Sequence, residues 1–578
     1  MRDGVRLAVD LHLPRDLGAG DRIPTILCQT RYHRRTRYRP LFAALFALTD
    51  PFRAARGRIM RHGYAFVTVD VRGSGASFGA RRMEWSPEEV ADGAEVVDWI
   101  VRQPWSDGTV GVTGISYVGT AAEMLLTVRH PAVKAAHIRY APFDICADIA
   151  NPGGVRNRRF LEIWSALNRA LDGNQVSALA RTALGRLAAL PIEGAAPVDG
   201  DEDGRERAAA VAGHAENYDI IETALGIAFR DDRTAAGVQY DAFSPHAFLP
   251  ELEASGAAVY SVSSYFDGAN GLAAVKRFLS VRSPDNRLLL GPWDHGGTQN
   301  PNPFAPSRRS GFDQFGEVLR YFDRHLKGLA NGIEREPPVH YFTMGEEAWK
   351  SAETWPPPGF PPTPLYLEGG HRLSWTPPAA ETGWDRYRVD PAASSGPTSR
   401  WVSLANVGGT RVGYPDRRAR DRRLLVYQSA PLDRAAEVTG HPILTLFLRS
   451  SAEDGQVFAY LEDVSPGGEV RYVTEGLCRA LHRPAPTDEP PPYRLPQGVP
   501  YRSLTRAHAR PLVPGEITEI TFDLMPVSHL FAAGHAIRLA VAGADRDNFE
   551  PVPDEPPEIE VLRAGAHASR LVLPLRMR

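Results

Sequence analysis

The 578-residue sequence predicts an α/β fold that contains a helical insertion and is followed by a β-rich domain. Within residues 1–143, short apolar and β-branched runs alternate with a helical pattern at 87–101, which is typical of βαβ units and a mostly parallel sheet. Helical apolar spacing takes over in residues 144–240, and short strands dominate after residue 345. These three patterns define the predicted architecture.

The predicted α/β domain is discontinuous and comprises residues 1–143 and 241–345. Residues 144–240 are predicted to form a helical cap that roofs the crevice of the sheet. A stiff proline-rich segment at 355–362 lies near the start of a third domain, expected to be a β-sandwich over residues 346–578. Strands of the α/β domain are expected at 24–28, 65–71, 110–114, 257–264 and 287–290, and those of the third domain at 365–367, 424–427, 443–448, 457–461, 517–524 and 537–541.

The most informative motif is Gly-Ile-Ser-Tyr-Val-Gly at residues 114–119, which follows a strand-like run and precedes a helical pattern. A tight turn between strand and helix lifts a serine hydroxyl clear of the sheet, where a histidine can accept its proton and backbone amides can hold an oxyanion. Ser116 is therefore a candidate nucleophile. The motif departs from the general Gly-x-Ser-x-Gly pattern because Val118 stands where the second glycine is usual.

Two later strand ends carry the side chains that such a serine requires. Asp267 follows the strand-like run at 257–264, and His295 lies in the glycine-rich loop after the run at 287–290. Because the carboxyl ends of parallel strands share one edge of a sheet, both side chains are expected to meet Ser116 there. The order Ser, Asp, His is that of an α/β-hydrolase triad, in which His295 is the general base and Asp267 orients it.

Two of these roles have rival residues. Asp294 competes with Asp267 for the acid role. However, it precedes His295 directly in the chain, so its carboxylate is poorly placed to contact the imidazole of that neighbouring residue. His246 and His33 are rival histidines. The glycines that follow His295 favour it over both, because they let its loop approach the serine closely.

Further motifs accompany the serine motif: Asp-Val-Arg-Gly-Ser-Gly at 70–75, Gln-Pro-Trp-Ser at 103–106, Tyr-Gln-Ser-Ala-Pro-Leu at 427–432 and Ala-Gly-His-Ala-Ile-Arg-Leu at 533–539. With these motifs the chain resembles the cocaine esterase-like (CocE/NonD) hydrolases, which are related to the X-Pro dipeptidyl-peptidases and the α-amino acid ester hydrolases. The Gly-x-Ser-Tyr-x-Gly form is that family's own. The resemblance covers nearly the whole chain and is weakest at 144–240.

The resemblance implies an α/β-hydrolase domain with an inserted helical cap, and a C-terminal jelly-roll of the X-Pro dipeptidyl-peptidase type. It implies the same triad, and an oxyanion hole made by the Tyr117 backbone amide and the Tyr32 hydroxyl. A phenol suits that role because it donates to a negative oxygen without being charged itself. Arg31 replaces the proline that precedes this tyrosine in the family pattern.

The expected substrate is a small ester or amide that is cleaved through an acyl-enzyme without a cofactor. In the related α-amino acid ester hydrolases, acidic residues that bind the substrate ammonium follow the triad aspartate, whereas this chain has Gly268, Ala269 and Asn270. Their absence favours an uncharged or anionic acyl group. Arg31 and Phe266 are further candidate substrate contacts. The alternatives are an X-Pro dipeptidyl-peptidase-like exopeptidase and, from another class, an idle hydrolase-fold binding protein.

Arginines at positions 31, 34, 35, 37 and 39 crowd the loop that carries Tyr32. Guanidinium groups there could bind an acidic substrate group through bidentate contacts. However, the chain has 66 basic residues of which only four are lysines, so any arginine cluster is weak evidence and a solvated surface is the simpler interpretation.

Composition restricts partners and compartment. A net charge of −3 gives no argument for nucleic acid or an anionic membrane as partner. Cys28, Cys146 and Cys478 are scattered and have no metal-site spacing, which fits a reducing compartment and predicts no metal.

The start of the chain predicts a cytoplasmic protein. Met1 leads directly into a strand-like alternation, and the apolar run at 41–48 is shorter than the roughly 20 residues of a membrane span. Relatives in the family carry a further strand before this point, so an upstream export segment stays open. The sequence does not indicate an oligomeric state.

Overall fold

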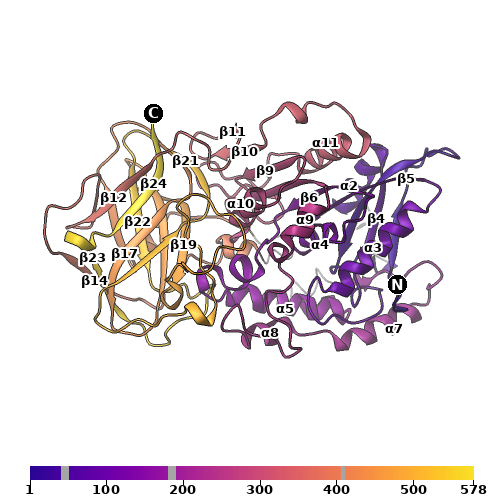
Figure 1. Ribbon diagram of the computed structural model, residues 1–578, viewed down its shortest axis with the longest axis horizontal. Coiled ribbons are helices and arrows are strands. Elements are labelled where there is room, and N and C mark those ends of the chain that lie inside the picture. Colours follow the sequence, from indigo (N-terminus) through magenta and orange to yellow (C-terminus); the bar gives the residue numbers. More distant parts are fainter. Residues whose placement is uncertain (41–50, 180–189, 405–410) are drawn as a thin grey trace.

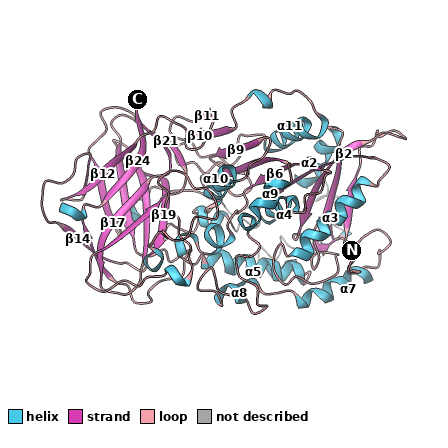
Figure 2. Cartoon of the chain, in the orientation of Figure 1, coloured by secondary structure: helices cyan, strands magenta, loops and turns pink. Residues whose placement is uncertain are grey.

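The computed structural model describes residues 1–40, 51–179, 190–404 and 411–578. An α/β domain and a β-rich domain lie side by side, and the C-terminal strands occupy one end of the molecule (Figure 1). Helices surround the sheet of the first domain, whereas strands fill the second (Figure 2). The predicted fold class, an α/β-hydrolase domain with an inserted helical cap and a C-terminal jelly-roll, is confirmed.

The sheet of the α/β domain has nine strands among the described residues, in the order β1-β4-β2-β5-β6-β8-β9-β10-β11. The neighbours from β4 to β10 pair in parallel, and the edge strands β1 and β11 pair antiparallel. Their bounds are β1 Val9–His12, β2 Ile23–Thr30, β4 Ala65–Asp70, β5 Ser106–Ile115, β6 Val133–Arg139, β8 Ala258–Ser264, β9 Asn286–Gly291, β10 Val339–Thr343 and β11 Ala348–Ala352.

Helices cover both faces of this sheet. Ile26 and Leu27, neighbours in β2, belong to different core clusters, as the two-residue period of a strand requires. Helices α2 and α11 pack on the Ile26 face, and α3, α4, α9 and α10 pack on the Leu27 face. Their bounds are α2 Pro51–Arg61, α3 Pro87–Val101, α4 Tyr117–Leu126, α9 Leu249–Ala254, α10 Asn270–Ser280 and α11 Gln314–Lys327.

The inserted segment contains the helices α5 (Arg158–Asp172), α7 (Arg205–Gly213) and α8 (Ile220–Leu225), which lie along one side of the α/β domain (Figure 1). A two-stranded ribbon of β3 (Thr36–Tyr38) and β7 (Ile192–Ala195) joins this cap to the arginine-rich loop. The apolar run at 41–48, and residues 180–189 of the predicted cap, lie outside the described residues.

The C-terminal domain is built mainly from antiparallel strands. The bounds are β12 Pro362–Glu368, β13 Arg372–Ser374, β14 Trp384–Arg388, β15 Leu425–Ser429, β16 Ala436–Gly440, β17 Ile443–Ser450, β18 Gln456–Val464, β19 Val470–Arg479, β20 Thr518–Asp523, β21 Val527–Phe531, β22 Ala536–Ala542, β23 Glu558–Leu562 and β24 Arg570–Met577. Two short helices, α12 (Arg400–Ser403) and α13 (Arg418–Asp421), interrupt them. Strands β10 and β11, which lie on either side of the predicted boundary at residue 346, pair with each other at the edge of the α/β sheet.

No helix among the described residues combines the length and the apolar character needed to cross a membrane.

Candidate active site

Ser116 occupies the sharp turn between β5 and α4. Its backbone has φ 59° and ψ −128°, a conformation that L-residues rarely adopt and that costs about 1–3 kcal/mol. The backbone amide of Ser116 donates to the carbonyl of Arg139 at 3.0 Å, which ties the turn to the end of the neighbouring strand β6. A strained serine between a strand and a helix is the geometry of a nucleophile elbow.

The two glycines of the motif explain its spacing. A Cβ atom at Gly114 would lie 2.3 Å from the backbone carbon of Val118, so no larger residue fits before the turn. A Cβ at Gly119 would lie 3.0 Å from the carbonyl oxygen of Arg139, where α4 passes close to β6. The second glycine is therefore needed one residue later than in the general pattern, and Val118 is accommodated.

The predicted acid and base lie in contact. Nδ1 of His295 is 2.8 Å from Oδ1 of Asp267, and the Asp267 side chain is fully buried at the end of β8. The other carboxylate oxygen of Asp267 accepts a hydrogen bond from Asn270 Nδ2 at 3.1 Å. The end of β8 is tied to the histidine loop, because the Ser264 hydroxyl donates to the carbonyl of Trp293 at 2.7 Å.

Tyr140 connects the serine turn with the histidine. It follows Arg139 directly, at φ 51°, and its ring meets the ring of His295 edge to face at a centroid distance of 6.2 Å. Since the amide of Ser116 is bonded to Arg139, Ser116 and His295 flank the same strand end. The adjacent parallel strands β5, β6, β8 and β9 thus bring the three predicted triad residues to one edge of the sheet.

The electrostatics of His295 suit a base paired with a carboxylate. Burial alone would lower the pKa of His295, but the charge and hydrogen bond of Asp267, together with the charge of Asp294, outweigh burial and raise that pKa above its usual value of 6.5. The rival Asp294 instead accepts bonds from the backbone amides of Thr298 and Gln299, both at 2.8 Å. Its carboxylate thereby shapes the loop that carries His295.

The rival histidines are engaged elsewhere. Nε2 of His33 lies 3.1 Å from the carbonyl oxygen of Leu171. Nε2 of His246 lies 3.0 Å from a carboxylate oxygen of Asp241.

Tyr32 follows β2, the neighbour of β5 on its other side, and its ring packs edge to face on Tyr117 at 6.0 Å. Its hydroxyl accepts a hydrogen bond from Trp164 Nε1 at 2.9 Å, which leaves the phenolic hydrogen available for another acceptor. Burial raises the pKa of Tyr32, so the phenol stays protonated at neutral pH. Tyr117 is the first residue of α4, where backbone amides have no acceptor within the helix.

An apolar pocket of about 700 Å³, its open mouth included, reaches Ser116 and Tyr117. Most of the residues that line the pocket belong to the cap, residues 144–240. The lining residues are Met83, Glu84, Trp85, Ser116, Tyr117, Pro142, Ile145, Ile149, Ala150, Phe160, Leu161, Trp164, Tyr218, Ile220, Thr223 and Tyr240. No arginine, lysine or histidine belongs to this lining among the described residues.

Comparison with known proteins places the chain in a family. Residues 3–297 match the model of the X-Pro dipeptidyl-peptidase (S15 family). The chain belongs to this family. Residues 331–571 match the X-Pro dipeptidyl-peptidase C-terminal non-catalytic domain.

Among curated family relatives, a Mycobacterium bovis protein provisionally named a serine esterase is 48% identical over 599 residues, covering 100% of this chain and 94% of the relative. The cocaine esterase of Rhodococcus sp. is 28% identical over 582 residues, covering 95% of this chain and 90% of that enzyme. The family membership and these relatives make the chain an enzyme of the serine hydrolase type.

Two solved structures share the fold with a TM-score of 0.71. A CocE/NonD family hydrolase from Staphylococcus aureus is 18% identical and is covered to 92%, and an α-amino acid ester hydrolase is 21% identical and is covered to 95%. Both alignments span 100% of this chain. The resemblance stated from the sequence is therefore confirmed.

The arginine-rich loop is not a free cationic surface. Arg31 is buried and paired with Glu84 and Asp172, and Arg34 is buried and paired with Asp70 and Asp10. Arg35 contacts Asp10, and Arg37 contacts Glu193. These partners neutralise the guanidinium groups of Arg31, Arg34, Arg35 and Arg37.

Phe266 is fully buried and packs against Tyr414 and Tyr472 of the C-terminal domain, with ring centroids 5.1 and 6.2 Å away. Arg31 lies behind the pocket wall, bound to Glu84. Neither expected substrate contact lines the pocket, because interdomain packing occupies Phe266 and ion pairs occupy Arg31.

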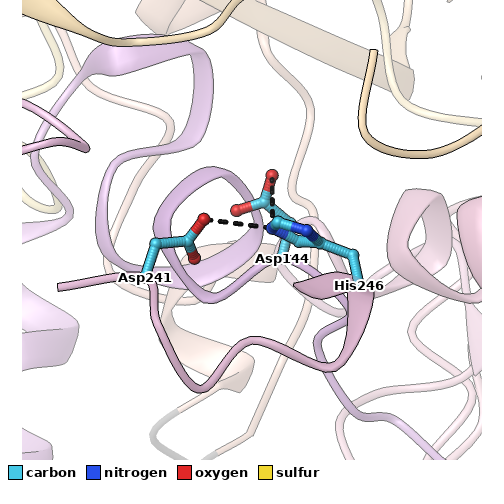
Figure 3. Close-up of side chains that lie close together, drawn as sticks. All are labelled: Asp144, Asp241 and His246. Carbon is cyan, nitrogen blue, oxygen red and sulfur yellow. Dashed lines mark hydrogen bonds and ion pairs between the residues drawn. The ribbon is translucent and has the colours of Figure 1, made fainter. Parts of the chain in front are cut away.

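A second group of titratable side chains, Asp144, Asp241 and His246, lies at the start and end of the cap (Figure 3). Arg230 sits among them and donates to both oxygens of Asp144, at 3.0 and 2.7 Å, and to Asp241. Burial would raise the pKa of Asp144, but the charge and hydrogen bonds of Arg230, together with the charges of His246 and Lys276, outweigh burial and lower it. Because Arg230 already supplies a cation here, the cluster is an ion-pair network that ties the start of the cap to the segment that follows it.

Sequence reasoning did not identify several residues that support the site. The sequence marks Asn270 only as a residue that stands in place of an acid, yet its side-chain amide donates to Asp267. Glu89 looks like an exposed residue of an amphipathic helix, but it is buried and accepts a hydrogen bond from the Tyr117 hydroxyl. Ser403 accepts a hydrogen bond from the backbone amide of His295 at 2.7 Å, across 108 residues of sequence.

Proposed function

We propose that the chain is a carboxylesterase that transfers an apolar acyl group from an ester to Ser116 and then to water. His295 takes the proton of the Ser116 hydroxyl as the oxygen attacks the ester carbonyl. The Tyr117 amide and the Tyr32 hydroxyl hold the developing oxyanion. The protonated His295 then gives its proton to the leaving alcohol, and the same base activates water for release of the acid.

One observation supports this proposal above the others: the buried Asp267 carboxylate is bonded to His295 at the sheet edge where the strained Ser116 turn also lies. A buried aspartate stabilises the imidazolium that forms when the serine attacks. Tyr140 supports proton transfer by fixing the face of the imidazole ring. In this arrangement the triad needs no cofactor.

The pocket supports an apolar acyl group. Its wall is aromatic and aliphatic, and its only carboxylate, Glu84, is bonded to Arg31 and lies 3.8 Å from Arg81 among the described residues. A free substrate ammonium therefore finds no unpaired acid, and an anionic acyl group finds no cation. We accordingly rank ester hydrolysis above the X-Pro dipeptidyl-peptidase activity after which the family is named.

A fluorophosphonate probe tests the nucleophile. Wild-type protein should gain the mass of one adduct, and Ser116→Ala should gain none. The control is Ser106→Ala, which removes a hydroxyl at the opposite end of β5 and should leave labelling unchanged. A wild-type protein that stays unlabelled would favour the idle binding protein.

Substrate comparison tests the acyl preference. p-Nitrophenyl butyrate and benzoate should be hydrolysed with a lower KM than the monoester of glutarate, because only the neutral acyl groups fit an apolar wall. Gly-Pro-p-nitroanilide should turn over poorly. Faster turnover of the dipeptide than of the esters would reverse the ranking.

A further inference from the structure

The C-terminal domain contacts the loops of Asp267 and His295 through α12 and Leu404, the residue that follows this helix. Ser403, at the end of this helix, is fully buried, and its hydroxyl accepts the backbone N–H of His295 at 2.7 Å. Arg400, at the start of the helix, is fully buried as well and donates from Nε to the carbonyl of Gly268 at 2.7 Å. One turn of helix thus touches both the loop of the base and the loop of the acid.

The contact with the acid loop is reciprocal. The amide of Gly268 donates to the carbonyl of Arg400 at 3.0 Å, so residue 268 is held by two hydrogen bonds to the same residue. Gly268 has φ 46°, and a Cβ atom on it would lie 2.5 Å from the Leu404 side chain. The residue after Asp267 is therefore shaped to receive the C-terminal domain.

The short helix is itself anchored in its own domain. Trp401 is buried, donates from Nε1 to Glu475 and packs edge to face on Phe549 at 4.9 Å. The Arg400 guanidinium also donates to the Tyr472 hydroxyl at 3.3 Å. Because the anchor belongs to the jelly-roll, the position of α12 is transmitted from that domain to the catalytic loops.

We propose that Ser403 and Arg400 are positioning residues of the esterase: the domain that the family description calls non-catalytic sets the geometry of the acid–base pair. Ser403 fixes the backbone of His295, and Arg400 fixes the residue beside Asp267. The Nδ1–Oδ1 distance of 2.8 Å then depends on two contacts that lie outside the α/β domain. This inference rests on the triad proposed above.

The consequence is a change in proton transfer rather than in substrate binding. The ionisable groups around the imidazole are Asp267 from the end of β8, the neighbouring Asp294 and the phenol of Tyr140 from the end of β6. If the His295 backbone shifts, its contact with Asp267 weakens and the imidazolium loses stabilisation. A displacement of about 1 Å can lower a rate constant by up to roughly 100-fold.

The test compares Ser403→Ala with Ser395→Ala. Both remove a buried hydroxyl of the C-terminal domain near α12, but Ser395 bonds Asp545 and Ser399 and, within the described part of the chain, makes no hydrogen bond to the loops of Asp267 and His295. On p-nitrophenyl butyrate, Ser403→Ala should lower kcat about 10- to 100-fold with KM within two-fold of wild type. The rising limb of its pH–kcat/KM profile should move to lower pH. Ser395→Ala should change neither quantity.

Two further measurements guard against simple misfolding. Hydrogen exchange of the peptide that contains His295 should be faster in Ser403→Ala and unchanged in Ser395→Ala. Ser403→Thr keeps the hydroxyl acceptor and should recover most of the lost kcat. If Ser403→Ala does not fold, Arg400→Lys, which keeps the charge and loses the directed Nε–H bond, should show the same kcat loss and pH shift.

The outcomes separate the two proposals. An active wild type with equal kcat and equal pH profiles in both serine variants would overturn the positioning role and leave the esterase standing. A wild type that neither hydrolyses esters nor reacts with the fluorophosphonate would overturn the esterase, and the positioning role with it.

Discussion

Replacing Tyr32 with phenylalanine removes one proposed oxyanion donor and little else. The ring packs edge to face on Tyr117 at 6.0 Å, a contact that phenylalanine keeps. The hydroxyl is lost, together with the hydrogen bond that it accepts from Trp164. The variant therefore isolates the contribution of a single O–H group to the transition state.

The size of the effect follows from the role. One oxyanion donor contributes about 2.7–4 kcal/mol, which corresponds to a loss of roughly 100- to 1,000-fold in kcat. KM should change little, because the negative charge that the phenol stabilises develops only in the transition state. An unpaired Trp164 N–H costs at most about 1–3 kcal/mol of stability, and the partial exposure of Trp164 favours the lower end.

Initial rates on p-nitrophenyl butyrate measure the effect, with urea unfolding as the check on stability. Tyr218→Phe is the matched control, since it removes a phenol hydroxyl from the lining of the apolar pocket and should leave kcat within about two-fold of wild type. Trp164→Phe keeps the Tyr32 hydroxyl but removes the donor that orients it. We therefore expect a smaller loss of kcat, on the order of 10-fold.

A Tyr32→Phe variant that keeps kcat within about three-fold of wild type would refute this reasoning, because no oxyanion donor is so weak. A raised KM with unchanged kcat would instead make Tyr32 a residue that binds ground-state substrate.

Three other variants test the elbow, the base and the buried ion cluster. Gly114→Ala places a methyl group against the backbone of α4 and should abolish activity or folding, whereas Gly213→Ala, in open space at a helix end, should be neutral in a thermal melt. Asp267→Asn removes the charge that raises the pKa of His295, so the rising limb of the pH–rate profile should shift to lower pH and kcat should fall about 10,000-fold; an unshifted limb would contradict the pairing. Arg230→Met leaves the buried carboxylates of Asp144 and Asp241 without their cation and should lower the free energy of unfolding in urea by about 3–5 kcal/mol. A loss below about 1 kcal/mol would show that the cluster does not stabilise the fold.

The α/β half was predictable because its signals are local. Apolar runs that end in glycine-containing loops marked the ends of β5, β8 and β9, and parallel strands bring such ends together whatever lies between them. The helix at 87–101 was predicted with its observed bounds, since Ser86 caps it and Pro87 starts it. The same local reasoning identified the partners Asp267 and His295.

The arginine-rich loop shows where local reasoning ends. Five arginines within nine residues look like a surface for anions, because the neutralising acids come from elsewhere in the chain. Asp172 reaches Arg31 from the cap, across 141 residues, and Asp70 reaches Arg34 from the end of β4. No spacing rule in the sequence connects these pairs, so only the fold distinguishes a buried ion-pair network from a binding site.

The backbone strain at the sheet edge that carries Ser116 explains why the contacts that stabilise this edge come from distant parts of the chain. Ser116 and Tyr140 both hold positive φ angles at the ends of adjacent strands, and each costs about 1–3 kcal/mol. Such conformations persist only where neighbouring contacts outweigh their cost. Glu89 from α3 binds the Tyr117 hydroxyl, and Trp85 donates to the Tyr117 carbonyl at 3.1 Å, so the residue after the serine is held from two sides. With α12 holding the loops of the acid and the base, the edge is constrained from the α/β domain and the jelly-roll together, and a change in either domain should reach the same proton transfer.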